Sequence, residues 1–218
     1  MSTGRPDALD DALDDAVETA LAYGKTLLGV PRGDNHHDDV VGRGDACPYW
    51  CADALPPPTS VVRTHGTNCA GLVNLMLRAV KGHPTAVSCS AADADAAHRE
   101  PSLGDTRNWF SYLTHQSCLH PFCETDQYPA GTLLLRDYNE RDHGHMAVVL
   151  APRDEHGVLH ARLLHSVGWD DGGELGVRID ETVGRSHFFQ YDGEHNCGHY
   201  THVCAPRDWL TIRVTSHV

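Results

Sequence analysis

The stretch 69–81, CAGLVNLMLRAVK, limits most strongly what this chain can fold into, because nearly every position around it is apolar. A helix that is hydrophobic on all sides has to be buried. Gly82 and Pro84 follow directly, and both residue types end helices. The sequence therefore predicts a central helix over 69–81 that other elements cover on several sides.

Two further helices are predicted around this one. Over residues 7–28, acidic residues fill many positions, and apolar residues recur at spacings of three and four: Leu9, Leu13, Val17, Ala20 and Leu21. This is the pattern of an amphipathic helix with a solvated acidic face. The segment NWFSYL, 108–113, predicts a short helix. Residues 31–68, rich in Gly, Pro, Asp and His, predict a long irregular excursion.

From residue 129 onward the sequence has the pattern of β-strands separated by turns. Pro152–Gly157 predicts the turn of a hairpin between two of the strands. Helices followed by antiparallel strands indicate the α+β class, and 218 residues suit a single domain over 1–218. The predicted strands are GTLLLRDY (131–138), HMAVVLA (145–151), VLHARLLHSVGW (158–169) and WLTIRV (209–214).

Charge and hydropathy exclude several classes of protein. The net charge is −13 and no Lys/Arg cluster is present, which argues against binding to nucleic acid or to an anionic membrane surface. No apolar stretch approaches the roughly 18 to 20 residues of a membrane span, so no membrane insertion is expected. The start, MSTGRPDALDDALDD, has no signal-peptide pattern. We expect a cytoplasmic protein or one exported without a classical signal peptide; the oligomeric state stays open.

A histidine- and cysteine-rich segment, HNCGHYTHVC at 195–204, raises the question of a metal site. Together with Cys47 and Cys51 it has the ligand types of a mixed zinc site, but the spacing matches no strong zinc pattern. The chain has eight cysteines, and without a secretory signal most are expected to be buried thiols. We therefore predict no metal and no cofactor.

Cys69 has the position of a nucleophile, at the point where a loop enters the buried helix. Unpaired backbone N–H groups and the positive end of the helix dipole meet there and favour a thiolate. The same N–H groups can receive an oxyanion. A thiol nucleophile also needs a nearby base and a residue that orients this base.

The predicted hairpin supplies both. With the turn centred near residues 154–155, antiparallel pairing places His145 opposite roughly residues 164–165, where cross-strand Cβ atoms lie about 4.5–5.5 Å apart. Alternation puts His145, Ala147 and Val149 on one face, and His165 on the same face of the next strand. The sequence therefore predicts Cys69 as nucleophile, His145 as base and His165 as its partner.

These residues lie in motifs that resemble one family. The segment TNCAGLVNLMLRAV, 67–80, is similar to the DCSGLV motif and helix of the NlpC family of papain-like cysteine peptidases. YPAGTLLLRDY, 128–138, resembles the PGDL strand of that family, and GHMAVVLA, 144–151, resembles its GHVGIYLG strand. VLHARLLHS resembles the next strand, which ends in the polar third residue. The order and spacing agree over most of the chain.

The resemblance implies a papain-like NlpC-type core of helices packed on an antiparallel sheet, with insertions near 31–64 and 170–204. It implies a Cys69–His145–His165 triad that cleaves a peptide or muropeptide substrate, in the family a peptidoglycan stem peptide. Asn68 replaces the usual Asp before the nucleophile. Tyr49 is the nearest match to the family's oxyanion Tyr, so Tyr49 and Asn68 are candidate substrate or oxyanion residues.

Two other classes of function remain open from the sequence. A thiol acyltransferase, deamidase or transglutaminase would use the same fold and the same nucleophile, because a fold does not fix a function. A non-catalytic metal-binding module would instead use the cluster at 195–204. Alkylation of the thiol separates catalysis from metal binding, and analysis of the products separates hydrolysis from transfer.

Overall fold

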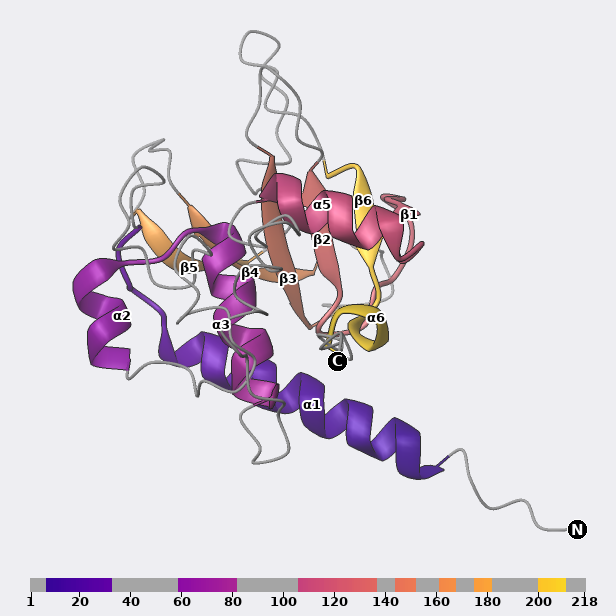
Figure 1. Cartoon of the computed structure of the whole chain (residues 1–218), viewed down its shortest axis with the longest axis horizontal. Helices are drawn as coiled ribbons and strands as arrows, with labels where there is room; N and C mark the ends of the chain where they lie inside the picture. The colour runs from indigo at the N-terminus through magenta and orange to yellow at the C-terminus, as the bar shows by residue number, and fades with distance from the viewer. Residues whose placement is uncertain are drawn as a thin grey trace, which may run out of the picture.

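The structure is a computed structural model that describes residues 7–32, 59–81, 106–136, 144–151, 161–167, 175–181 and 200–210 (Figure 1). The helices are α1 (Asp7–Thr26), α2 (Thr59–His65), α3 (Cys69–Lys81), α5 (Thr106–His115) and α6 (Pro206–Leu210). The strands are β1 (His120–Pro121), β2 (Leu133–Arg136), β3 (His145–Ala151), β4 (Arg162–Val167), β5 (Gly176–Asp180) and β6 (His202–Cys204).

Within these ranges the six strands form one sheet in the order β1-β6-β2-β3-β4-β5. Every neighbouring pair is antiparallel. β2 and β3 pair from Leu133↔Val148 to Arg136↔His145, and β3 and β4 pair through Val148↔Leu164. Helices together with an antiparallel sheet confirm the predicted α+β class.

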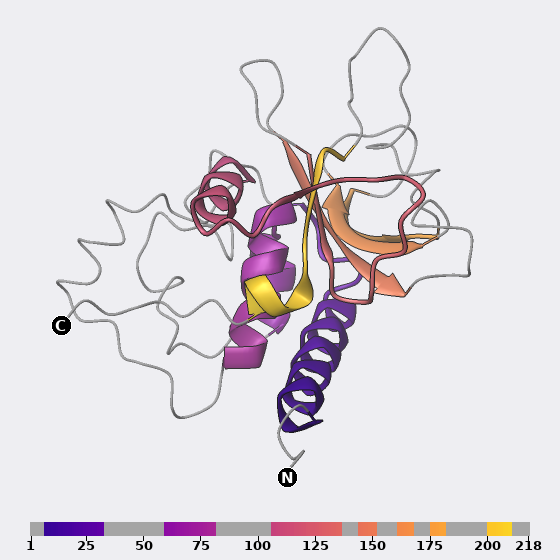
Figure 2. The same ribbon diagram turned by 90° about the vertical axis from the view of Figure 1, so that its right-hand side faces the viewer.

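The larger hydrophobic core lies between the helices and one face of the sheet. Figure 2 shows α3 and α5 on one side of the strands, and α1 runs beneath them. Alternate residues of β3, Met146, Val148 and Leu150, point into this core. They meet the buried residues of α3, which include Leu72 and Met76. The helix predicted to be buried on several sides is indeed the centre of the fold.

The opposite face of the sheet carries a second, smaller core. Ala147 and Val149 of β3 and Leu163 of β4 belong to it, and Tyr200 packs against them. By the alternation of the two strands, His145, the first residue of β3, and His165 of β4 lie on this same face. The predicted sharing of a face by His145, Ala147 and Val149 is therefore what the strand shows.

The segment that follows α1 joins two distant parts of the chain. The Gly29 N–H donates to Val177 O at 2.9 Å, and the Val177 N–H donates to Val30 O at 2.8 Å, so this segment lies along β5. The Thr67 N–H donates to Pro31 O at 3.0 Å. One short segment thus connects β5 with the turn that precedes Cys69.

Several predicted elements agree with the structure and one is wrong. α3 and β3 have the predicted bounds, and α5 covers the predicted NWFSYL helix. The predicted final strand 209–214 is wrong at its start, because Trp209 and Leu210 belong to α6. Pro206 suits the first turn of a helix, and the buried Trp209 ring donates its Nε1–H to Gly131 O at 2.8 Å. Residues 211–214 lie outside the described residues.

Part of the predicted irregular excursion is wrong, whereas the predicted insertions near 31–64 and 170–204 stay a prediction. Residues 59–65, expected to be irregular, form α2. The region 170–204 contributes β5 and β6 to the sheet, so these parts belong to its framework. Tyr49 lies outside the described residues. In the described part of the chain, no helix has both the length and the apolar character that a membrane crossing requires.

Candidate active site

Cys69 is the first residue of α3, and Asn68 caps the helix in front of it. The Gly71 N–H donates to Asn68 Oδ1 at 2.7 Å, and the Leu72 N–H donates to Asn68 O at 2.9 Å. These are the contacts of an N-cap residue. The Cys69 and Ala70 N–H groups have no acceptor within the helix. The thiol, which is partly exposed, therefore lies at the positive end of a buried helix.

The turn before Cys69 is fixed to the strand that carries His165. Ser166 Oγ donates to Thr67 O at 2.7 Å, and this hydrogen bond is buried. On its other side, the Thr67 N–H is bound to Pro31 O. This hydrogen bond therefore holds β4 directly against the start of α3, one residue after His165 and two residues before Cys69.

Thr106, the first residue of α5, joins Cys69 to the start of β3. Its Oγ1 lies 3.4 Å from Cys69 Sγ. A Cβ built on Gly144 would lie 2.9 Å from Thr106 Cγ2, so the backbone directly before His145 packs against the Thr106 side chain. One turn later in α5, the buried Trp109 ring donates to Asn74 Oδ1 at 2.8 Å, which fixes α5 to α3.

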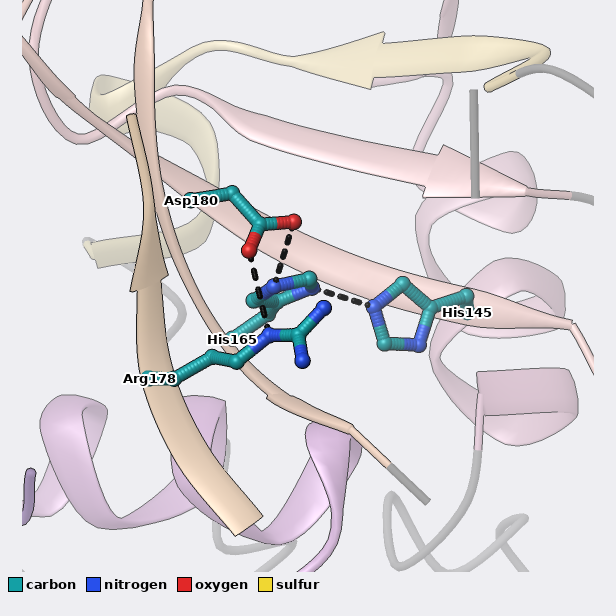
Figure 3. A network of polar contacts seen from close by, with 4 residues as sticks. All are labelled: His145, His165, Arg178 and Asp180. Carbon is teal, nitrogen blue, oxygen red and sulfur yellow. Dashed lines mark hydrogen bonds and ion pairs between the residues drawn. The ribbon is translucent and has the colours of Figure 1, made fainter. Parts of the chain in front are cut away.

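The two predicted histidines are in direct contact. His145 Nε2 lies 3.0 Å from His165 Nδ1, and the rings meet edge to face with centroids 5.2 Å apart (Figure 3). His145 is 3 % exposed and His165 is 0 % exposed, so water contributes little to this contact. The Nε2 atom of His145 therefore faces His165, and Nδ1 lies on the other side of the ring.

The predicted register of the two histidines is wrong by about two residues. Continuing the pairing Val148↔Leu164 toward the start of β3 places Ala147, and not His145, opposite His165. The ladder shifts between Val149 and Ala151, where the strand has a bulge or irregularity. His145 reaches His165 diagonally on the same face, a distance that long side chains can span.

Behind His165 lies a carboxylate that the sequence did not point to. Asp180 Oδ2 is 3.1 Å from His165 Nε2, and Asp180 Oδ1 is 3.1 Å from Arg178 Nε. Both residues belong to β5, in which Arg178 pairs with His165 across the ladder. The structure thus contains a row of polar side chains from His145 through His165 to Asp180 and Arg178 (Figure 3).

The other residues predicted for the site are Asn68, Tyr49 and the segment 195–204. Asn68 has a helix-capping contact, and its role at an oxyanion stays a prediction, as does that of Tyr49. The segment 195–204 is described only from residue 200 onward. Among the residues that the structure describes, no group of three or more His, Cys, Asp or Glu side chains is arranged to hold a metal ion.

Three other described cysteines provide a comparison for Cys69. Cys204 is buried, and burial raises the pKa of its thiol far above the ordinary value, with a further contribution from the Asp208 carboxylate. Burial also raises the pKa of the Cys118 thiol. Cys123 is exposed, with Thr125 Oγ1 3.2 Å from its sulfur. Of these four described thiols, only Cys69 is the first residue of a helix, α3.

Comparisons with protein-family models, with curated proteins and with solved structures give no significant match.

Proposed function

We propose that this chain is a thiol hydrolase with a papain-like NlpC-type core that cleaves an amide bond of a peptide. Cys69 is the nucleophile, His145 is the base and His165 orients His145. The observation that carries the proposal is the buried 3.0 Å contact of His145 Nε2 with His165 Nδ1. It supports the assignment because it joins the proposed base to a second side chain that can orient it, as a catalytic base requires.

The connection between Cys69 and His145 supports the same assignment. Cys69 Sγ lies against Thr106 Oγ1, and the Thr106 side chain lies against Gly144, the residue before His145. The hydrogen bond between Ser166 and Thr67 fixes the other side. Three elements, α3, α5 and β4, therefore converge where the strand β3 begins.

The proposed reaction has two steps. The Cys69 thiol transfers its proton to His145 as its sulfur attacks the carbonyl carbon of the amide, and the proton then passes to the leaving amine as the carbon–nitrogen bond breaks. A water molecule, deprotonated by His145, attacks the resulting thioester. The carbon–sulfur bond breaks, the acid leaves, and the proton returns to Cys69.

The start of α3 also offers stabilisation for the oxyanion of this reaction. The Cys69 and Ala70 N–H groups point out of the helix end, because α3 supplies no carbonyl acceptor to its first residues. A backbone N–H at this place can donate to the oxygen that becomes negative during the attack. Asn68 fixes the direction of these groups through its hydrogen bond with the Gly71 N–H.

The substrate class proposed from the motif resemblance is a short peptide of the cell-wall stem type. The test incubates the protein with defined muropeptides and analyses the products by mass spectrometry. We expect cleavage of one amide bond in the stem peptide and none with Cys69→Ala. Cys123→Ala, which removes an exposed thiol that is not part of the proposed triad, is the matched control and should cleave normally. Release of an ammonia or an acyl-transfer product instead of peptide fragments would contradict hydrolysis of a peptide bond.

Brief treatment with iodoacetamide at neutral pH tests the nucleophile without a substrate. Peptide mapping of all eight cysteines should find Cys69 labelled first, ahead of the more exposed Cys123. The reason is that Cys69 begins a buried helix, a position typical of reactive thiols, and has His145 as its proposed base. Native protein in which another cysteine is labelled first and Cys69 stays unmodified would remove the assignment.

A further inference from the structure

β5 places two charged residues on the face of the sheet that carries the histidines. His165 pairs with Arg178 and Leu163 pairs with Asp180, so Asp180 lies diagonally from His165 on the same face. The two oxygens of the Asp180 carboxylate are divided between two neighbours: Oδ2 lies 3.1 Å from His165 Nε2 and Oδ1 lies 3.1 Å from Arg178 Nε (Figure 3).

The charges of this group favour an ionised Asp180. Its side chain is 13 % exposed, and the guanidinium of Arg178, which is always protonated in proteins, compensates the negative charge. The His165 side chain is fully buried. The contact between Asp180 and His165 is an ion-pair contact in which the ring N–H is not well aligned with the oxygen, so its effect is electrostatic.

The position of the carboxylate determines where His165 carries its proton. An ionised carboxylate only accepts hydrogen bonds. A lone pair on His165 Nε2 would face the lone pairs of an oxygen 3.1 Å away, whereas an N–H at Nε2 is attracted to it. A neutral His165 therefore has its proton on Nε2 and its lone pair on Nδ1, the atom that faces His145.

The same reasoning continues to His145. If His165 Nδ1 has the lone pair, the hydrogen bond between the rings requires that His145 Nε2 carries the proton. The lone pair of His145 is then on Nδ1, where a base for Cys69 needs it. We infer that Asp180, held by Arg178, is a positioning residue that fixes the tautomers of His165 and His145. The use of the His145 lone pair by Cys69 rests on the proposed function, whereas the proton positions do not.

Nitrogen NMR tests the proton positions directly. Long-range proton–nitrogen spectra of ¹⁵N-labelled Cys69→Ala protein at pH 8 report the tautomer of each neutral histidine, and single His→Gln substitutions assign the signals. We expect the proton on Nε2 in both His145 and His165. A proton on Nδ1 of His165, or a doubly protonated His165, would overturn the inference because either would give Nε2 of His145 the lone pair.

Asp180→Asn, added to the same protein, removes the charge and keeps the shape. An amide can donate to His165 Nε2, so the proton of His165 should move to Nδ1 and that of His145 should follow to Nδ1. Glu181→Gln is the matched control, because Glu181 is the next residue, is exposed, and pairs with Arg162 at 3.0 Å. Unchanged tautomers in a folded Asp180→Asn protein would overturn the inference. If that variant does not fold, the spectrum of the reference protein decides alone.

Activity then separates this inference from the proposed function. In protein with Cys69 intact, Asp180→Asn should slow alkylation of Cys69 and lower kcat by about 10- to 100-fold, the usual size for loss of an orienting partner. KM should change little, and Glu181→Gln should behave as the unmodified protein. Tautomers that switch while alkylation and kcat stay unchanged would overturn the role of Asp180 in positioning the base. Unmodified protein that neither cleaves peptides nor alkylates rapidly would instead remove the proposed function and leave the tautomer result standing.

Discussion

At the scale of single residues, Cys69 and the two histidines differ in their access to solvent. Cys69 is partly exposed, whereas His145 and His165 are buried. A nucleophile has to reach the substrate, and its base has to exchange protons with the nucleophile, the leaving amine and water. Burial also strengthens the hydrogen bond between the two rings, because water does not compete for it. In the proposed function, the more exposed residue is the nucleophile and the two buried residues are the base and its partner.

Substitution of the histidines tests their assignment. His145→Ala should lower turnover by about 100-fold or more, the usual contribution of a general base. His143→Ala should lower it far less, because residue 143 precedes the strand and its alternation. His143 itself lies outside the described residues. His165→Ala should give an intermediate loss, since an orienting residue is partly replaceable. Steady-state kinetics with the muropeptide substrate measures all three.

Each histidine variant first has to show an unchanged melting transition, because His145 and His165 are buried and their loss can affect folding. A nearly inactive His143→Ala protein together with a His145→Ala protein of normal turnover would contradict the assignment of the base. The proposed triad would then have to be abandoned.

Sequence reasoning could propose Cys69, His145 and His165 because each is marked by a local pattern. Cys69 begins an apolar helix, and the histidines follow the alternation of their strands. Thr106 and Asp180 have no such mark. Thr106 reaches Cys69 because α5 packs beside α3, where the Trp109–Asn74 hydrogen bond joins the two helices. Asp180 reaches His165 only because β5 pairs with β4, which no local pattern in a short, partly exposed strand predicts.

At the scale of the elements, the interiors of the long apolar segments were predictable and their connections were not. α3 and β3 follow from hydrophobicity and alternation. The register between β3 and β4 depends on where the turn is centred and on the irregularity between Val149 and Ala151, neither of which alternation specifies. The face of a residue is thus more predictable than its partner across the ladder, and here the shared face was enough to bring the histidines together.

The N-cap of α3 is expected to contribute to stability as well as to position Cys69. Asn68→Ala removes the acceptor of the Gly71 N–H and should reduce the free energy of unfolding by about 1 kcal/mol. For a chain of this length that corresponds to about 2–4 °C in Tm. Asn68→Asp keeps the cap and should leave Tm nearly unchanged. Equal losses in both variants, measured by differential scanning calorimetry, would show that the cap is not the stabilising contact.

The attachment of β5 depends on Gly176. Its φ is +118°, and a Cβ at this position would lie 2.1 Å from Val30 O, a backbone atom that cannot move aside easily. Gly176→Ala should therefore reduce the free energy of unfolding by about 2 kcal/mol or more, through strain and the forced separation of β5 from the segment after α1.

Gly29→Ala is the matched control for this substitution. Gly29 also has a positive φ, +73°, but a Cβ there would meet nothing within 4 Å. It should lose only the backbone term, about 1 kcal/mol. Urea denaturation measures both variants. If Gly29→Ala is as destabilising as Gly176→Ala, the close approach of β5 to Val30 is not the reason that position 176 requires a glycine.

At the scale of the whole molecule, the helices and the sheet share one large core, so a change deep in that core affects global stability. Cys204 is a fully buried member of it, at the end of β6 next to α6. Trp209 of α6 and Leu133 of β2 belong to the same core. A thiol in this place cannot ionise without bringing a charge into apolar surroundings, which burial strongly disfavours.

Global stability should consequently fall at alkaline pH because of Cys204. Burial, followed by the Asp208 carboxylate and Cys118, raises the pKa of the Cys204 thiol above its ordinary value of 9.0. The stabilisation from keeping this thiol neutral is complete below pH 9 and is lost as the pH rises further, because only the unfolded chain then releases the proton. The loss amounts to about 1.4 kcal/mol per pH unit above 9.

Guanidinium denaturation at pH 8 and pH 10.5 tests this. The free energy of unfolding should fall between these pH values by about 2 kcal/mol more in the unmodified protein than in Cys204→Ala, which keeps every other titrating group. An equal difference in the two proteins would mean that the Cys204 thiol ionises in the folded state, and that its surroundings are more polar than the packing of β6 against α6 indicates.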